Sequence, residues 1–91
     1  MTTDVKDNPE RQRFELDVDG QVAFARYRRE PGRLLIQHVE APPALRGTGA
    51  ASKLMDGIVE LARAEGAKIV PLCSYAVAWM RRHDEHRDLL A

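Results

Sequence analysis

Two glycines and an arginine stand directly before a predicted helix, in the segment Arg46-Gly47-Thr48-Gly49-Ala50-Ala51. Glycine lets the backbone turn with positive φ, so several N–H groups can point into one concavity. A helix N-terminus adds a partial positive charge there, and both features favour a phosphate or pyrophosphate. Arg46 at the rim adds a charged donor. The alternative is a plain glycine turn into a helix, and the residues alone leave both interpretations open.

Two common phosphate motifs do not fit this segment. A P-loop requires Gly-Lys-Ser/Thr, which does not follow the glycines. A dinucleotide fingerprint requires an acidic residue about 20 positions later, where the chain has Ile69-Val70-Pro71. If a phosphate binds here, it belongs to another class of ligand.

Cys73 is the single cysteine, which excludes an intramolecular disulfide and a multi-cysteine zinc site and favours a reducing compartment. It precedes Ser74, the predicted N-cap of a second helix. A helix start favours the thiolate form, so Cys73 is a candidate nucleophile. The alternative is a buried cysteine that packs as a small apolar residue.

Glu40, at the end of a predicted strand, is the best placed carboxylate for a general base, and its alternative is a solvated strand-end acid. His38 lies on the same strand face as Glu40. Tyr75 either donates to a leaving thiolate or packs against Trp79. The three histidines are too few and too scattered to predict a metal site.

The hydrophobic pattern predicts which elements position these residues. Residues 1–11 are expected to form a flexible lead-in and residues 12–91 a single domain. Alternating apolar residues predict strands over 13–18 and 21–29, joined by an Asp19-Gly20 turn, and an apolar run predicts a third strand over 34–40.

The period then changes to three and four residues, which predicts a helix over 49–65 that ends at Gly66. A fourth strand over 67–73 should pair with the third in parallel, because a helix separates them. A second helix over 75–82 and a last helical turn over 83–90 follow. The class is α+β: three antiparallel strands, a helix, a parallel fourth strand and short C-terminal helices.

The composition is that of a globular domain, with 91 residues, 44% apolar and 31% charged. Fourteen basic residues balance fourteen acidic ones, so nucleic acid and anionic membranes are poor candidate partners. No apolar run approaches the ~20 residues of a membrane span, and the first residues lack the apolar region of a signal peptide. We therefore expect a cytoplasmic location.

The segment 46–51 also fits the pattern Gln/Arg-x-x-Gly-x-Gly/Ala, and it resembles the acyl-CoA pyrophosphate motif of the GNAT N-acetyltransferase superfamily. Further segments resemble a very small, single-domain branch of that family over residues 12–90: Arg13-Phe14-Glu15-Leu16, Val18-Asp19-Gly20, His38 to Gly47, Pro71-Leu72-Cys73-Ser74-Tyr75 and His83 to Leu90. In that branch proline is commoner at the position of Asp84, and tyrosine at the position of His86.

The resemblance implies a site for acetyl-CoA. The backbone N–H groups of Arg46, Gly47, Thr48, Gly49, Ala50 and Ala51 would hold the pyrophosphate, and Val39, Glu40 and Ala41 would pair with the pantetheine amides. Cys73 would lie near the thioester, with Tyr75 beside it, and in this branch the cysteine is suspected of being a nucleophile or acyl acceptor. Larger members more often use a general base for direct attack by an amine.

The expected function is thus N-acetyl transfer from acetyl-CoA to an unknown amine, by way of Cys73 or by direct attack with Glu40 as base. A CoA or acyl-CoA sensor without catalysis is one alternative. An interaction scaffold that binds peptides along its sheet edge is another. We expect a monomer or a weak homodimer.

Overall fold

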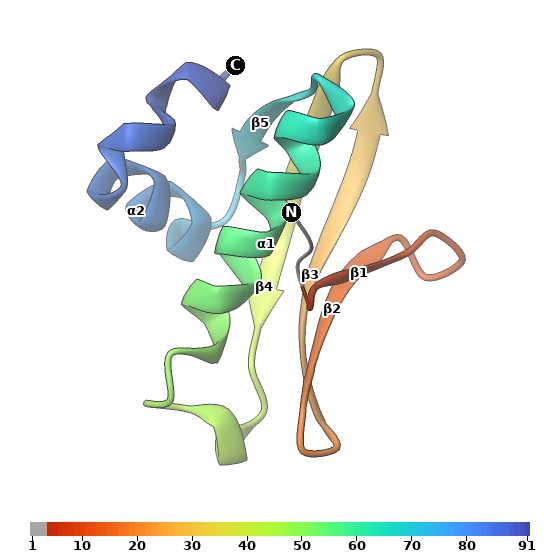
Figure 1. The fold of residues 1–91 in the computed structure, drawn as a ribbon, viewed down its shortest axis with the longest axis vertical. Coiled ribbons are helices and arrows are strands. Elements are labelled where there is room, and N and C mark those ends of the chain that lie inside the picture. Colours follow the sequence, from red (N-terminus) through yellow and green to blue (C-terminus); the bar gives the residue numbers. More distant parts are fainter. Residues whose placement is uncertain (1–3) are drawn as a thin grey trace.

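The structure, a computed structural model, describes residues 4–91, and within them five strands form one sheet in the order β1-β2-β3-β4-β5 (Figure 1). The strands are β1 (Lys6–Asn8), β2 (Arg13–Val18), β3 (Gln21–Glu30), β4 (Arg33–Glu40) and β5 (Lys68–Pro71). The helices are α1 (Ala50–Glu65) and α2 (Ser74–Arg82), with the short 3-10 helices η1 (Pro43–Leu45) and η2 (Asp84–Leu89). The predicted α+β class is confirmed.

The β2–β3 hairpin forms where the sequence predicts it. Its turn places Asp19 at φ 52° and Gly20 at φ 85°, the left-handed pair that suits a two-residue hairpin turn. Phe14 and Leu16 of β2 and Ala23 and Ala25 of β3 are buried. These residues occupy the sheet face that α1 covers.

A β-bulge in β4 changes which residues face the helix. Arg26 of β3 pairs with His38, but the next residue, Tyr27, pairs with Ile36, so Gln37 is an extra residue on β4. Before the bulge, Ile36 is fully buried; after it, Val39 packs against the core. His38 and Glu40 therefore lie on the other face of the sheet, which we call the outer face.

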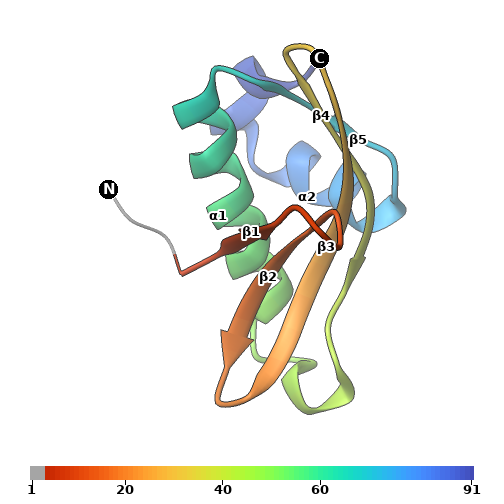
Figure 2. The same ribbon diagram turned by 90° about the vertical axis from the view of Figure 1, so that its right-hand side faces the viewer.

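β5 pairs with β4 in parallel, as a right-handed crossover through α1 requires. Helix α1 lies across one face of the sheet, and no helix of the described chain covers the outer face (Figure 2). The fully buried side chains of Leu54 and Ile58 join α1 to the sheet. Gly66 ends α1 at φ 71°, which confirms the predicted cap.

The N-terminal segment differs from its prediction. A flexible lead-in was expected over residues 1–11, yet Lys6–Asn8 pair with β2 and Val5 is only 4% exposed. Residues 1–3 lie outside the described residues. Arg29 forms ion pairs with both Asp7 and Glu65, and the Tyr27 hydroxyl donates to Asp7. These contacts tie β1 to β3 and α1, and they involve charged residues that no alternation pattern marks.

The C-terminal elements also differ in detail. Cys73, rather than Ser74, is the N-cap of α2, and Ser74 is the first helical residue. The predicted last turn is the 3-10 helix η2, and Leu89 anchors it in the core. No helix among residues 4–91 is long and apolar enough to cross a membrane.

A part-buried hydrogen bond joins helix α2 to the first turn of α1. The indole Nε1 of Trp79, a fully buried residue, donates to Ser52 Oγ at 2.9 Å. His83 stacks on the same indole with ring centroids 3.8 Å apart. Trp79 therefore links α2, the C-terminal segment and the start of α1.

We predict that Ser52→Ala lowers the free energy of unfolding by ~1–3 kcal/mol, because the buried indole N–H loses its acceptor. Thermal unfolding followed by circular dichroism measures this as a Tm lower by several degrees. Ser74→Ala is the matched control, because Ser74 is exposed and its hydroxyl has no hydrogen-bond partner among residues 4–91. Equal Tm shifts in the two variants would contradict the prediction.

Candidate functional site

The loop between β4 and α1 forms one wall of a pocket of about 280 Å³. Gly47 and Gly49 adopt φ 79° and 83°, left-handed conformations that other residues rarely take. The remaining wall comes from the first turn of α1, from Ala41 after β4 and from Tyr75 of α2. The glycine segment and Tyr75, which the sequence analysis selected separately, thus line the same pocket.

Hydrogen bonds within the loop use about half of its N–H groups. Those of Arg46 and Thr48 donate to the carbonyls of Pro43 and Leu45, each at 3.2 Å. The N–H of Ala50 donates to Thr48 Oγ1 at 3.3 Å. Three of the six predicted donors are therefore already engaged inside the loop.

Four N–H groups at this place have no acceptor within the described part of the chain: those of Gly47, Gly49, Ala51 and Ser52. The first intrahelical bond at this end runs from Lys53 N–H to the Gly49 carbonyl at 3.0 Å, so Ala51 and Ser52 hold two of the unpaired donors of a helix N-terminus. The arrangement favours an anion with several oxygens. Ser52 was not among the predicted binding residues, although it stands three positions after the second glycine.

Tyr75 contributes a hydroxyl to the pocket. Burial raises the pKa of Tyr75 above its usual value of 10.0; the positive charge of Arg82 opposes this change and the negative charge of Asp56 adds to it. The hydroxyl therefore stays protonated near neutral pH and is able to donate a hydrogen bond. A bound oxygen or sulfur in the pocket is a suitable acceptor.

Cys73 lies at the start of α2, half-buried, and packs against the core. Its Sγ accepts a hydrogen bond from Ala76 N–H at 3.4 Å, which is its role as N-cap. Both predicted properties, a thiol at a helix start and a packed side chain, are present together. No histidine or carboxylate among residues 4–91 contacts Sγ.

Glu40 is separated from the other candidates by the β-bulge. Its carboxylate is 56% exposed on the outer face and lies 3.0 Å from His38 Nε2. Val39 and Ala41, its neighbours in the chain, pack against the core on the α1 side together with Cys73 and Tyr75. The structure thus brings Ala41, the loop and Tyr75 together and directs Glu40 to the opposite face.

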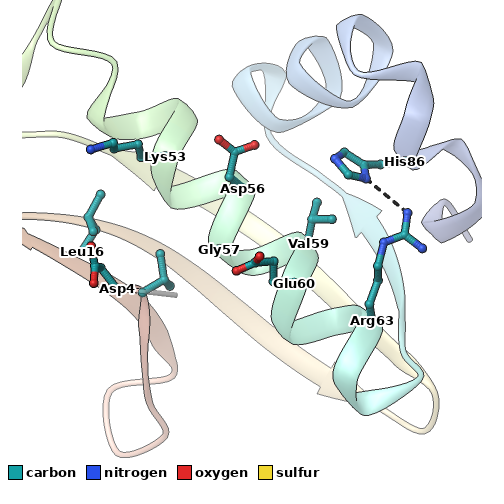
Figure 3. Close-up of a pocket in the computed structure, with 10 residues that line it drawn as sticks. Asp4, Leu16, Lys53, Asp56, Gly57, Val59, Glu60, Arg63 and His86 are labelled. Carbon is teal, nitrogen blue, oxygen red and sulfur yellow. Dashed lines mark hydrogen bonds between the residues drawn. The ribbon is translucent and has the colours of Figure 1, made fainter. Parts of the chain in front are cut away.

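Two larger hollows lie outside this pocket. One, of about 590 Å³, lies beside Cys73 along α2 and includes Leu72, which is 55% exposed. The other, of about 550 Å³, crosses α1 at Gly57, between Leu16 and Asp4 on one side and His86 on the other (Figure 3). Neither shares a lining residue with the loop pocket. Residues 4–91 contain no cluster of three or more metal-binding side chains.

Comparisons with known proteins agree with this architecture. The family model for GCN5-related N-acetyl-transferases matches residues 13–89. The NMR solution structure of a GCN5-like candidate N-acetyltransferase from Staphylococcus aureus is similar, with a TM-score of 0.69 and 25% sequence identity over 100% of this chain and 91% of that one. Among curated proteins none matches. The family match covers strands β2 to β5, both α-helices and the glycine loop, and the chain therefore belongs to the GCN5-related N-acetyltransferase family.

Proposed function

We propose that the chain binds acetyl-CoA through the loop between β4 and α1 and transfers the acetyl group to a primary amine. The observation that carries the proposal is the set of four N–H groups without acceptors, at Gly47, Gly49, Ala51 and Ser52. A pyrophosphate supplies several oxygens for such donors, and the helix N-terminus favours its charge. Arg46 stands beside them as a charged donor.

The pantetheine arm of the cosubstrate would follow the end of β4. Pairing between β4 and β5 ends near Ile36, whose carbonyl accepts the N–H of Leu72 at 2.9 Å. Beyond this point the backbone of Val39, Glu40 and Ala41 makes no ladder bond to β5, so it is available for the amides of the arm. We assign Val39, Glu40 and Ala41 this backbone role.

We assign Cys73 the role of nucleophile. The Cys73 thiol gives up its proton, its sulfur attacks the acetyl carbonyl and bonds to the acetyl carbon, and the bond from that carbon to the CoA sulfur breaks. The departing CoA sulfur takes a proton from the hydroxyl of Tyr75, which regains one from solvent. Attack by the acceptor amine then forms the amide and returns Cys73 to a thiol. The N-cap position supports this role, because Sγ lies at the start of α2 and accepts a hydrogen bond from Ala76 N–H.

Glu40 is assigned the role of general base toward the acceptor. Its carboxylate is exposed on the outer face and lies beside His38, so it is reachable from the side opposite the loop pocket. At neutral pH a primary amine is protonated to an ammonium ion, and it must lose a proton before it attacks.

Calorimetric titration of acetyl-CoA tests the binding half. A Cβ at Gly49 meets no protein atom within 4 Å and would project into open space at the pocket lining. We predict that Gly49→Ala raises Kd at least about tenfold, since loss of charged hydrogen bonds costs roughly 1.5–3 kcal/mol.

Gly66→Ala is the matched control for this titration. Gly66 has a similar positive φ at the other end of α1, so an added methyl strains both sites by a similar amount, about 1–2 kcal/mol. Only the Gly49 variant should lose affinity. If acetyl-CoA does not bind the wild-type chain saturably, the proposed function is overturned. The interaction scaffold is then the remaining alternative.

Intact-protein mass spectrometry after incubation with acetyl-CoA tests the covalent route. We predict that the wild-type chain gains one acetyl group on Cys73 and that Cys73→Ser gains none. Serine is a strong N-cap residue, so the variant keeps α2 capped. If Cys73→Ser releases CoA in the presence of an amine as fast as wild type, the amine attacks acetyl-CoA directly.

The base role is tested with n-propylamine as acceptor, by following CoA release. We predict that Glu40→Gln slows transfer by about 10²–10⁴-fold at neutral pH, the usual contribution of general base catalysis. Glu10→Gln is the control, because Glu10 is an exposed acid with no ion pair among residues 4–91. A sensor without catalysis would bind acetyl-CoA and show no CoA release in any variant.

A further inference from the structure

The hollow beside Cys73 adjoins α2, as the loop pocket does, but the two share no lining residue. The hollow is lined by Leu72, Cys73, Val77, Ala78, Arg81 and Arg82, among others, and its volume of about 590 Å³ is typical of small-molecule sites. The loop pocket contacts α2 through Tyr75. Cys73 and Ser74 therefore line this hollow, and the next residue, Tyr75, lines the loop pocket.

Strand alternation places Leu72 on the outer face. Ile69 of β5 is fully buried toward α1, so Val70 and Leu72 point the other way. The hydrogen bond from Leu72 N–H to the Ile36 carbonyl continues the strand geometry to this residue. Leu72 thus shares the outer face with His38 and Glu40, which the bulge in β4 turned there.

The floor of the hollow is apolar and its rim is positively charged. Leu72 is the one large hydrophobic residue among positions 4–91 that is mostly exposed, and the half-buried Val77 and Ala78 adjoin it. Arg81 and Arg82 are exposed and form no ion pair with any residue of the described range. Positively charged side chains near the C-terminus of a helix interact favourably with the helix dipole, which accounts for Arg81 and Arg82. The dipole does not account for the exposed Leu72 beside them.

We propose that this hollow binds the acyl acceptor, and that the acceptor is a primary amine carrying a carboxylate on an apolar chain. This inference rests on the proposed function. The carboxylate pairs with Arg81 and Arg82, and the chain covers Leu72. Glu40 takes one proton from the ammonium group, and the neutral amine attacks the acetyl carbonyl carried by Cys73. The C–N bond forms, the C–S bond to Cys73 breaks, and the second proton lost by the nitrogen passes to the departing Cys73 sulfur.

The test compares two probes in ¹⁵N-labelled protein. The probes ε-aminocaproate and cadaverine share a methylene chain and a primary amine, and they differ in whether the far end is a carboxylate or an ammonium ion. We expect ε-aminocaproate to shift the amide signals of Leu72, Val77 and Ala78 saturably, and cadaverine to leave them unchanged. In the double variant Arg81→Gln/Arg82→Gln the Kd should rise at least about tenfold, as for loss of charged hydrogen bonds.

Arg87→Gln is the control for loss of charge, because Arg87 is 77% exposed on η2 and does not line the hollow. Equal response to both probes, or no response of the three amides to ε-aminocaproate, would overturn the inference. Calorimetry with acetyl-CoA on the same samples separates the two proposals. Acetyl-CoA binding without a response in the hollow refutes only the acceptor site, whereas failure to bind acetyl-CoA refutes the proposed function.

Discussion

The arrangement of the candidate site depends on one irregularity, the extra residue Gln37 in β4. Side chains of a strand alternate between its faces, so a single inserted residue reverses the orientation of everything after it. Without the bulge, Glu40 would face α1 and Val39 would face solvent. With it, Val39 packs against the core and Glu40 lies on the outer face. The ladder to β5 ends at the same point, near Ile36, so residues 39–41 have no partner on the β5 side, although Val39 and Glu40 still pair with β3.

Much of this fold follows from the hydrophobic pattern, because that pattern records which face of each element is buried. The hairpin turn, the long helix with its Gly66 cap and the parallel fourth strand were all predicted from it. Strand β1 was not, since three polar residues at an edge carry no alternation and are held by Arg29 and Tyr27 from other elements. The bulge was not predicted either, because nothing in the types of Ile36, Gln37 and His38 distinguishes a bulged strand from a regular one.

The site was predictable to a similar degree. The glycine segment and Cys73 were found from residue types, because positive φ and a helix start have strong residue preferences. The sequence did not predict which N–H groups remain unpaired, because this depends on the hydrogen bonds that Pro43, Leu45 and Thr48 make inside the loop. From the sequence, Leu72 was predicted to be part of a buried strand. It is exposed because β5 is an edge strand whose ladder ends with Pro71, and its side chain follows the outer-face alternation.

Helix α2 borders both the loop pocket and the hollow beside Cys73. Tyr75 faces the loop pocket, Val77 and Arg81 face the other hollow, and the buried Trp79 fixes the helix to Ser52, whose own N–H is one of the unpaired donors. A shift of α2 would therefore move Cys73 relative to both hollows at once. Because interiors are close-packed, the indole that holds α2 against α1 permits little such movement. The first turn of α1, the start of α2 and the thiol between them thus form one rigid unit, so the position of Cys73 is set by core packing rather than by the flexibility of a loop.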